Sequence, residues 1–174
     1  MKILVTGSTG YIGKRLLPEL INNGHEIICC VRDKNRFTPP KSLVQHLQII
    51  EVDFLDKASL QKIPHDIDAA YYLIHSMATS SDDFETLEEQ CAQNFKSLVA
   101  NTSCNQVIYL SGITNEEILS KHLQSRKNVE EALASKKYAL TTFKAGIIVG
   151  SGSSSFEIIR DLVEKLPFIS PGES

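Results

Sequence analysis

Three glycines, spaced three residues apart, lie between an apolar run and a segment with helical periodicity. Residues 2–6 form a short β-branched run of the kind found in buried strands, and residues 11–22 carry apolar side chains at helical spacing. Gly7 permits a sharp turn out of such a strand, Gly10 lets the backbone approach a ligand closely, and Gly13 lets the helix pack tightly on the strand. The pattern predicts a strand, a tight loop and a helix in direct succession.

The amide groups at the start of this helix have no intrahelical partner, and together with the helix dipole they favour an anion. Ser8 and Thr9 add hydroxyl donors. The glycines can also be explained as a tight turn alone, whereas a Walker loop is excluded because no Gly-Lys-Ser or Gly-Lys-Thr follows. We expect the loop to bind the diphosphate of a dinucleotide through these residues: Gly7, Ser8, Thr9, Gly10, Tyr11, Ile12 and Gly13.

The remainder of the chain alternates short apolar segments with helical patterns. The run 27–31 is apolar on both faces, as a central parallel strand requires. After the first strand, further strands are expected at 25–31, 47–52, 66–74, 106–110 and 139–149, helices at 56–63, 81–100, 121–136 and 153–166, and at 32–46 a loop with one short helix at most. Six strands alternating with helices predict an α/β fold, a single Rossmann domain (residues 1–174) with a doubly wound parallel sheet in strand order 3-2-1-4-5-6.

The composition is that of an ordinary soluble globular domain, with 174 residues, 42% of them hydrophobic, and a net charge of −3. This mildly acidic balance favours no nucleic-acid or membrane partner, and no apolar run is long enough for a signal peptide or a membrane helix. We therefore expect a cytoplasmic protein. The five histidines lack metal-ligand spacing, so no metal is expected. We expect the four cysteines to be reduced and mostly buried: Cys29, Cys30, Cys91 and Cys104.

The residue that follows the second predicted strand indicates which dinucleotide binds. Sites that prefer NAD usually place Asp or Glu there to bind the ribose hydroxyl, but this chain has Arg32, which suits a 2′-phosphate. Lys34, Arg36 and Lys41 follow, with Asp33 the one acidic residue up to position 46. The pattern predicts NADP(H), with NAD less favoured. The alternative explanation of the charges is a solvated loop, and Asp33 can serve a ribose if the strand ends one residue later.

Further segments occur in a characteristic order along nearly the whole chain. They are Thr6-Gly7-x-x-Gly10-x-x-Gly13, Val52-Asp53-Phe54, residues 70–77 (Ala-Tyr-Tyr-Leu-Ile-His-Ser-Met), Asn94-Phe95, Tyr109-Leu110-Ser111-Gly112 and residues 144–150 (Lys-Ala-Gly-Ile-Ile-Val-Gly). With these segments the chain resembles the short-chain dehydrogenase/reductase superfamily. The likeness is greatest to its atypical members, which are NmrA-like and nucleoside-diphosphate-sugar-epimerase-like.

The resemblance implies roles for residues that follow the later strands. Three groups are expected along the cofactor: Asp53 and Phe54 beside the adenine, Leu73, Ile74 and His75 after the fourth strand, and Lys144 and Ala145 towards the nicotinamide. The first two groups have plain structural alternatives. Asp53 can be a helix cap or a surface carboxylate, His75 a hydrogen-bonded residue at a strand end, and the two apolar residues part of the core.

Enzymes of this superfamily use a Ser after the fifth strand and a Tyr-x-x-x-Lys pair on the next helix. Ser111 matches the first position, but the helix has His122 and Arg126 in place of Tyr and Lys. Helical spacing puts both on one stripe, so both can face the cofactor, although a solvated first helical turn explains them equally. Relatives usually continue into a C-terminal substrate lobe, which we expect to be largely absent before Ser174.

Two hypotheses remain open. In the first, the chain is an NADP(H)-dependent reductase or epimerase-like enzyme acting on a small carbonyl, quinone or sugar-nucleotide substrate. Ser111 then polarises the substrate oxygen, His122 exchanges the proton and Arg126 binds ribose hydroxyls. In the second, the chain is a non-catalytic redox sensor or assembly factor that binds NADP(H). The sequence leaves the oligomeric state open.

Overall fold

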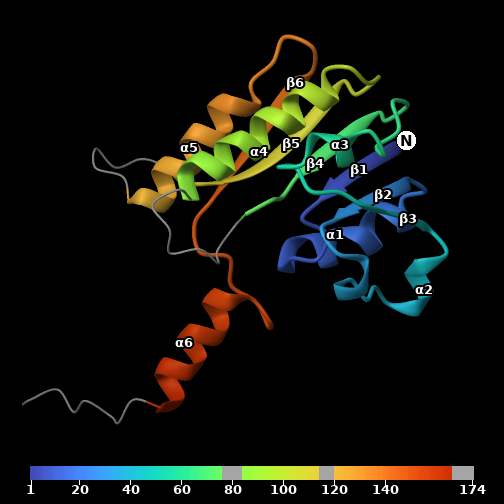
Figure 1. Cartoon of the computed structure of the whole chain (residues 1–174). Helices are drawn as coiled ribbons and strands as arrows, with labels where there is room; N and C mark the ends of the chain where they lie inside the picture. Colours follow the sequence, from blue (N-terminus) through green and yellow to red (C-terminus); the bar gives the residue numbers. More distant parts are fainter. Residues whose placement is uncertain (76–83, 114–119, 166–174) are drawn as a thin grey trace, which may run out of the picture. The chain divides into compact units, whose positions relative to one another are not determined.

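A parallel six-stranded sheet organises the chain. The computed structural model describes residues 1–75, 84–113 and 120–165. The strands lie in the order β3-β2-β1-β4-β5-β6 (Figure 1), which confirms the predicted doubly wound topology. The strands are β1 (Lys2–Thr6), β2 (Glu26–Val31), β3 (Leu47–Glu51), β4 (Ala69–Tyr72), β5 (Gln106–Gly112) and β6 (Ala139–Ala145).

Helices connect these strands. They are α1 (Tyr11–Asn22), the 3-10 helix η1 (Lys34–Arg36), α2 (Lys41–Val44), α3 (Lys57–Leu60), α4 (Phe84–Val99), α5 (Lys121–Leu133) and α6 (Ser154–Lys165). Ser153 caps α6, since its hydroxyl accepts a hydrogen bond from the Phe156 amide at 3.2 Å. The expected loop at 32–46 contains two short helices, the 3-10 helix η1 and α2, where one short helix was expected. Positions 81–83 and 166 of the expected helices lie outside the described residues.

Two strands are shorter than their apolar runs predict. β6 ends at Ala145, not at 149, and the apolar side chains of Ile147 and Val149 are 72% and 60% exposed. β4 spans 69–72 in place of 66–74 because side chains bind the backbone at both ends. The Asp68 carboxylate accepts a hydrogen bond from the Lys2 amide at 2.7 Å, and beyond the strand the Thr6 hydroxyl accepts one from the Leu73 amide at 3.0 Å.

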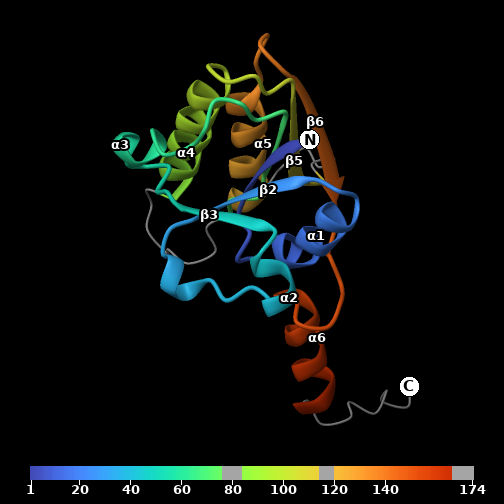
Figure 2. The same ribbon diagram turned by 90° about the vertical axis from the view of Figure 1, so that its right-hand side faces the viewer.

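Each face of the sheet carries its own apolar cluster. In β1, Leu4 joins the cluster under α4 and α5, whereas Ile3 and Val5 join the one under α1. Cys30 and Cys29 likewise divide between the two faces, as the alternation of strand side chains requires. Figure 2 shows α4 and α5 on one side of the sheet and α1 on the other. The central strands are thus buried on both faces.

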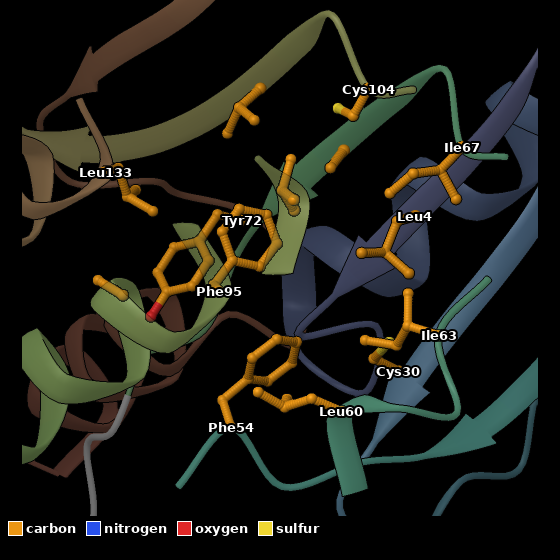
Figure 3. Close-up of a cluster of buried hydrophobic side chains, with 14 of the residues drawn as sticks. Leu4, Cys30, Phe54, Leu60, Ile63, Ile67, Tyr72, Phe95, Cys104 and Leu133 are labelled. Carbon is orange, nitrogen blue, oxygen red and sulfur yellow. The ribbon is translucent and has the colours of Figure 1, made fainter. Parts of the chain in front are cut away.

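The larger cluster is built around aromatic rings (Figure 3). Phe95 of α4 is fully buried, and its ring lies edge-on to that of Tyr72 at a centroid distance of 4.8 Å. The Phe54 ring also packs against the Phe95 ring, at a centroid distance of 5.7 Å. These contacts hold α4 against β4 and against the segment after β3, and so position both beside the carboxyl edge of the sheet.

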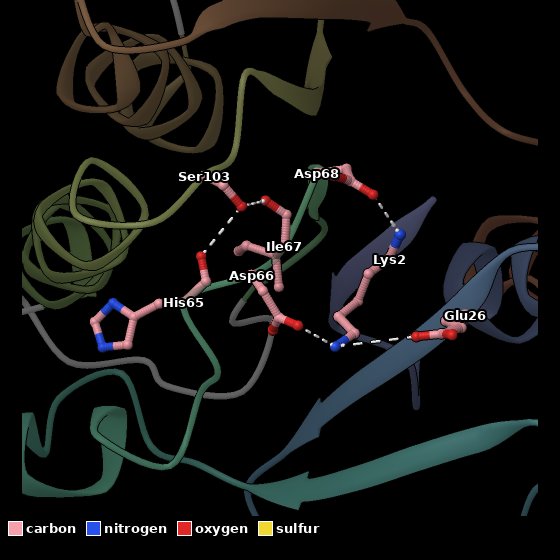
Figure 4. A network of polar contacts seen from close by, with 7 residues as sticks. All are labelled: Lys2, Glu26, His65, Asp66, Ile67, Asp68 and Ser103. Carbon is pink, nitrogen blue, oxygen red and sulfur yellow. Dashed lines mark hydrogen bonds and ion pairs between the residues drawn. The ribbon is translucent and has the colours of Figure 1, made fainter.

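The amino edge of the sheet is joined by polar contacts (Figure 4). The Lys2 ammonium lies 2.5 Å from an Asp66 carboxylate oxygen and 4.0 Å from one of Glu26. The Ser103 hydroxyl donates to the Ile67 carbonyl at 2.8 Å, which joins the start of β4 to the turn before β5. These contacts fix the strand starts at the edge opposite to the glycine loop.

The chain divides into two compact units, Met1–Lys144 and Ala145–Ser174. The first contains the sheet except the last residue of β6, and the second contains α6. The single domain expected from the sequence stays a prediction. Within the described ranges, no helix has the length and apolar character needed to span a bilayer.

Candidate functional site

The glycine loop adopts a conformation that side chains would obstruct. Gly7 has φ +66°, in the left-handed region, and a Cβ there would overlap the Leu73 carbonyl. A Cβ on Gly13 would lie 2.5 Å from the Gly7 carbonyl oxygen, so α1 packs directly on the loop. Gly10 is different: its φ is −76° and its Cβ would lie 3.2 Å from that oxygen. Gly10 is also the N-cap of α1, so the helix begins without a capping side chain.

The pairing of β1 with β4 ends just before Thr6, next to this loop. Pairing between β1 and β4 ends at Val5 and Tyr71. Beyond that point the Thr6 hydroxyl donates to the Tyr71 carbonyl and accepts from the Leu73 amide, both at 3.0 Å. The hydroxyl thus replaces ladder hydrogen bonds where β1 and β4 separate. β1 lies between β2 and β4. The chain adds β2 and β3 on one side of β1 and then β4, β5 and β6 on the other side, and ligands bind at this switch in strand order in open α/β sheets.

A cleft of about 300 Å³ lies at this point. Nine of its lining residues are among those predicted to bind the cofactor: Gly7, Thr9, Gly10, Arg32, Asp53, Phe54, Leu73, Ile74 and His75. The others are Thr6, Cys30, Val31, Val52, Leu55, Leu87, Glu88 and Cys91. Strand ends, the glycine loop and one face of α4 therefore form a single cleft at the carboxyl edge of the sheet.

Charged residues flank the cleft after β2 and β3. β2 ends at Val31, so Arg32 is the first residue beyond the strand, and its side chain is exposed at the cleft. Asp33 caps η1, with its carboxylate accepting from the Asn35 amide at 2.9 Å. Asp53 is exposed as well, and its carboxylate accepts from the Leu55 amide at 2.9 Å. Of the two candidates after β2, the guanidinium rather than the Asp33 carboxylate lines the cleft.

Three apolar residues of the cleft also belong to the core. Phe54 is only 4% exposed, and its carbonyl accepts a hydrogen bond from the buried Asn94 amide group at 2.7 Å. Leu73 and Ile74 are partly buried, on opposite faces of the sheet. Their role as packing residues is observed, and their contact with a cofactor stays a prediction.

An unforeseen polar chain crosses the wall of the cleft. His75 Nδ1 lies 3.2 Å from Glu88 Oε1, and Glu88 Oε2 accepts a hydrogen bond of 2.6 Å from the Ser125 hydroxyl. Glu88 is 6% exposed and Ser125 1%. These contacts hold the buried Glu88 side chain between α5 and the segment after β4, as a buried acidic group requires.

The structure brings Ser111 and Arg126 to neighbouring places on β5 and α5, with His122 one helical turn from Arg126. Ser111 of β5 is 3% exposed, and in the described chain its hydroxyl has no partner with hydrogen-bond geometry, although it lies near enough to lower the pKa of Tyr109, which burial raises. Arg126 donates to the Leu110 carbonyl at 3.0 Å, which attaches α5 to β5. His122 is exposed. The buried residues of α5 are Ser125, Val129 and Leu133, and helical spacing places the last two on the same stripe as His122 and Arg126.

The remaining predicted positions lie around the loop and on β6. Ser8 is fully buried, next to the Cys29 thiol, whose pKa burial raises to about 12 while Ser8 lowers it. Tyr11, Ile12 and Gly13 form the first turn of α1. Lys144 pairs with Glu130 of α5 at 3.4 Å, and Ala145 belongs to the second compact unit. Among the described residues, no group of His, Cys, Asp and Glu side chains could hold a metal ion.

Sequence reasoning missed Glu88, Ser125 and Cys91 as parts of the site. The available signal was a carboxylate on the apolar stripe of α4, since Glu88 lies one turn before Ala92 and two before Phe95, both fully buried. A charged residue on a buried face requires a partner. The partners lie 13 and 37 positions away in the chain, which no local pattern shows.

Comparisons with known proteins agree with this geometry. Residues 3–141 match the model of the NAD dependent epimerase/dehydratase family. The chain is 46% identical over 70 residues, 36% of its length, to a UDP-glucose 4-epimerase of Haemophilus influenzae, and 24% identical over 155 residues, 84% of its length, to a chloroplastic divinyl chlorophyllide a 8-vinyl-reductase of Zea mays. A UDP-glucuronic acid 4-epimerase from Bacillus cereus, solved in complex with NAD, superposes with a TM-score of 0.74 over 96% of this chain at 20% identity.

These proteins are longer than the present chain. The match covers 20% of the Haemophilus epimerase, 39% of the maize reductase and 64% of the solved Bacillus chain. The likeness therefore concerns the part with the glycine loop and the sheet. At 20% identity, the solved structure supports the fold.

Proposed function

The chain belongs to the NAD dependent epimerase/dehydratase family, and on this premise we propose that it binds NADP(H) in the cleft beside Gly7 and transfers hydride to or from a small substrate. The observation that carries the proposal is the glycine loop: it has no side chain beyond Cα at Gly7 and Gly10, and it leads into an uncapped helix that faces the cleft. Such a helix start binds the diphosphate of dinucleotides.

The residues of the cleft fit the rest of a dinucleotide. The exposed Arg32 side chain is available to a 2′-phosphate, which a guanidinium binds through two parallel hydrogen bonds. Asp53 and Phe54 flank the adenine end, and Leu73, Ile74 and His75 continue along the cofactor. The solved Bacillus relative holds NAD, so the preference for NADP(H) rests on Arg32.

The bound cofactor supplies or accepts the hydride, and this chain's residues handle the substrate oxygen. Ser111 is the strongest candidate to bind that oxygen, because its buried hydroxyl has no partner with hydrogen-bond geometry among the described residues, and a ligand can provide one. His122 and Arg126 are proposed for proton exchange and ribose binding. Reductases and epimerases both occur among the relatives, and we favour a small carbonyl, quinone or sugar-nucleotide substrate.

One observation favours a second function, an NADP(H) sensor or assembly factor without turnover. The Arg126 guanidinium already donates to the Leu110 carbonyl, and His122 is exposed on α5. The two functions differ in turnover. An enzyme oxidises NADPH in the presence of a carbonyl or quinone panel, and His122→Ala lowers that rate by roughly 100-fold or more. A sensor binds NADPH without oxidising it.

Cofactor binding is tested by thermal denaturation with NADPH and with NADH. At 100 times its Kd, a ligand stabilises the fold by about 2.7 kcal/mol. We expect the larger shift with NADPH, and we expect Arg32→Ala to remove that advantage. Arg36→Ala is the matched control, because Arg36 is an exposed basic residue of the same segment that does not line the cleft. An unchanged preference in Arg32→Ala would exclude the proposed 2′-phosphate contact.

A further inference from the structure

The His75–Glu88–Ser125 chain contains an acidic side chain in the wall of a cleft proposed to bind a negatively charged dinucleotide. The charges that line this cleft therefore affect binding. The titratable side chains lining the cleft around His75 are Arg32 after β2, Asp53 after β3, and Glu88 and Cys91 of α4. Burial raises the pKa of Cys91 to about 11, so the thiol is neutral at pH 7. Among the described lining residues, one cation then faces two anions, so their net charge is negative while the imidazole is neutral. A protonated His75 brings the balance to zero.

His75 is close enough to the glycine loop to act on the same ligand. A Cβ on Gly7 would overlap the Leu73 carbonyl, so the chain touches the loop there. His75 follows two residues later, which is at most about 7 Å of extended chain. Its side chain is 25% exposed and lines the cleft together with Thr9 and Gly10. An imidazolium at this place lies between a buried carboxylate and the ligand's negative charge.

Glu88 and Ser125 determine how the imidazole is held. The carboxylate accepts from Ser125 on one oxygen and faces Nδ1 of His75 with the other. A carboxylate beside one ring nitrogen fixes the orientation of the ring and stabilises its protonated form. Tyr72 and Tyr109, which lie near Glu88, remain neutral because burial raises the pKa of both phenols. Neither competes with the imidazole for the proton.

We propose that the protein binds a proton together with its dinucleotide, that His75 takes up this proton, and that Glu88 and Ser125 are the positioning residues. The inference rests on the proposed function, since it concerns the same cleft. Imidazole is the side chain whose charge changes between pH 5 and 8. Affinity therefore decreases as pH rises and the imidazolium loses its proton. A tenfold coupling, within the usual range, corresponds to an uptake of about half a proton at the midpoint.

The test is calorimetric titration with NADP⁺ and with NAD⁺ from pH 5.5 to 8.5, in buffers of different ionisation enthalpy. NAD⁺ is included because the 2′-phosphate of NADP⁺ itself titrates near pH 6, as phosphate monoesters do. We expect Kd to rise by up to about tenfold as pH increases across this range, with proton uptake for both ligands. His75→Gln loses both effects. His65→Gln, whose imidazole contacts the Asn101 carbonyl outside the cleft, retains them.

Variants of the positioning residues give an independent readout. Glu88→Gln moves the midpoint of the affinity profile to lower pH, because the imidazolium loses its anion, and Ser125→Ala moves it less since the carboxylate remains. A wild-type protein that binds the dinucleotide without proton uptake overturns this inference and leaves the proposed function standing. The same follows if His75→Gln keeps the pH dependence. Failure of the wild type to bind either dinucleotide overturns both.

Discussion

The glycine loop makes a prediction that separates folding from binding. Gly7→Ala places a side chain on left-handed backbone, which costs about 1–2 kcal/mol, and overlaps the Leu73 carbonyl, for which overpacking adds about 1–3 kcal/mol. Gly10→Ala keeps an allowed φ of −76° and brings Cβ to 3.2 Å from the Gly7 oxygen. As an N-cap, alanine is less favourable than glycine by about 1 kcal/mol or less.

We therefore expect Gly7→Ala to lose about 3 kcal/mol, or about 6–12 °C in Tm for a chain of this size, and Gly10→Ala at most about 4 °C. For NADPH affinity we expect the opposite order, with the clear loss in Gly10→Ala, which keeps its fold. The Gly10→Ala methyl group occupies the place expected for the diphosphate, so its Kd for NADPH should rise at least about tenfold while the fold persists. Urea denaturation and calorimetry of both variants provide the measurements. Equal destabilisation, or Gly10→Ala with wild-type affinity, would refute this reasoning.

Three further predictions concern side chains in and around the site. Thr6→Val conserves shape but leaves a backbone amide and a carbonyl unpaired, so urea denaturation should show a loss of about 2–4 kcal/mol. Asn94→Leu leaves the Phe54 carbonyl without its donor and should cost about 1–3 kcal/mol by the same assay; stability equal to wild type would contradict the importance of this hydrogen bond. Burial raises the pKa of Cys29 to about 12 and of Cys91 to about 11, so at pH 8 at most about one thiol in a thousand is ionised at either site. Thiol-specific reagents should label both slowly at pH 8 and faster as pH rises, with Cys91 protected by NADPH; rapid labelling at pH 8 would contradict the assigned burial.

The sequence predicted the sheet and the loop because both depend on local patterns. The apolar run of β2 is compatible only with a strand buried on both faces of the sheet. The glycine spacing before α1 is compatible with a tight loop between a strand and a helix. Strand ends were less predictable. Ile147 and Val149 continue the apolar run of β6, yet their side chains are exposed, and the local signal for the earlier strand end is Gly146.

The site itself was predicted in part. Residues directly after strand ends, such as Arg32 and Asp53, line the cleft as expected, because parallel strands end at one edge. The inward face of α5 was predictable only in part. Val129 and Leu133 are buried as their spacing suggests, whereas His122 is exposed and Ser125 is buried against Glu88 of α4. Glu88 depended on partners from two other elements and could be found only in the fold.

A crystal structure of the chain grown with NADPH tests the central claim most directly. The account predicts the diphosphate at the amides of the first turn of α1, next to Gly10, and the 2′-phosphate beside Arg32. A dinucleotide bound elsewhere on the protein, or a loop that stays empty at saturating NADPH, would contradict it.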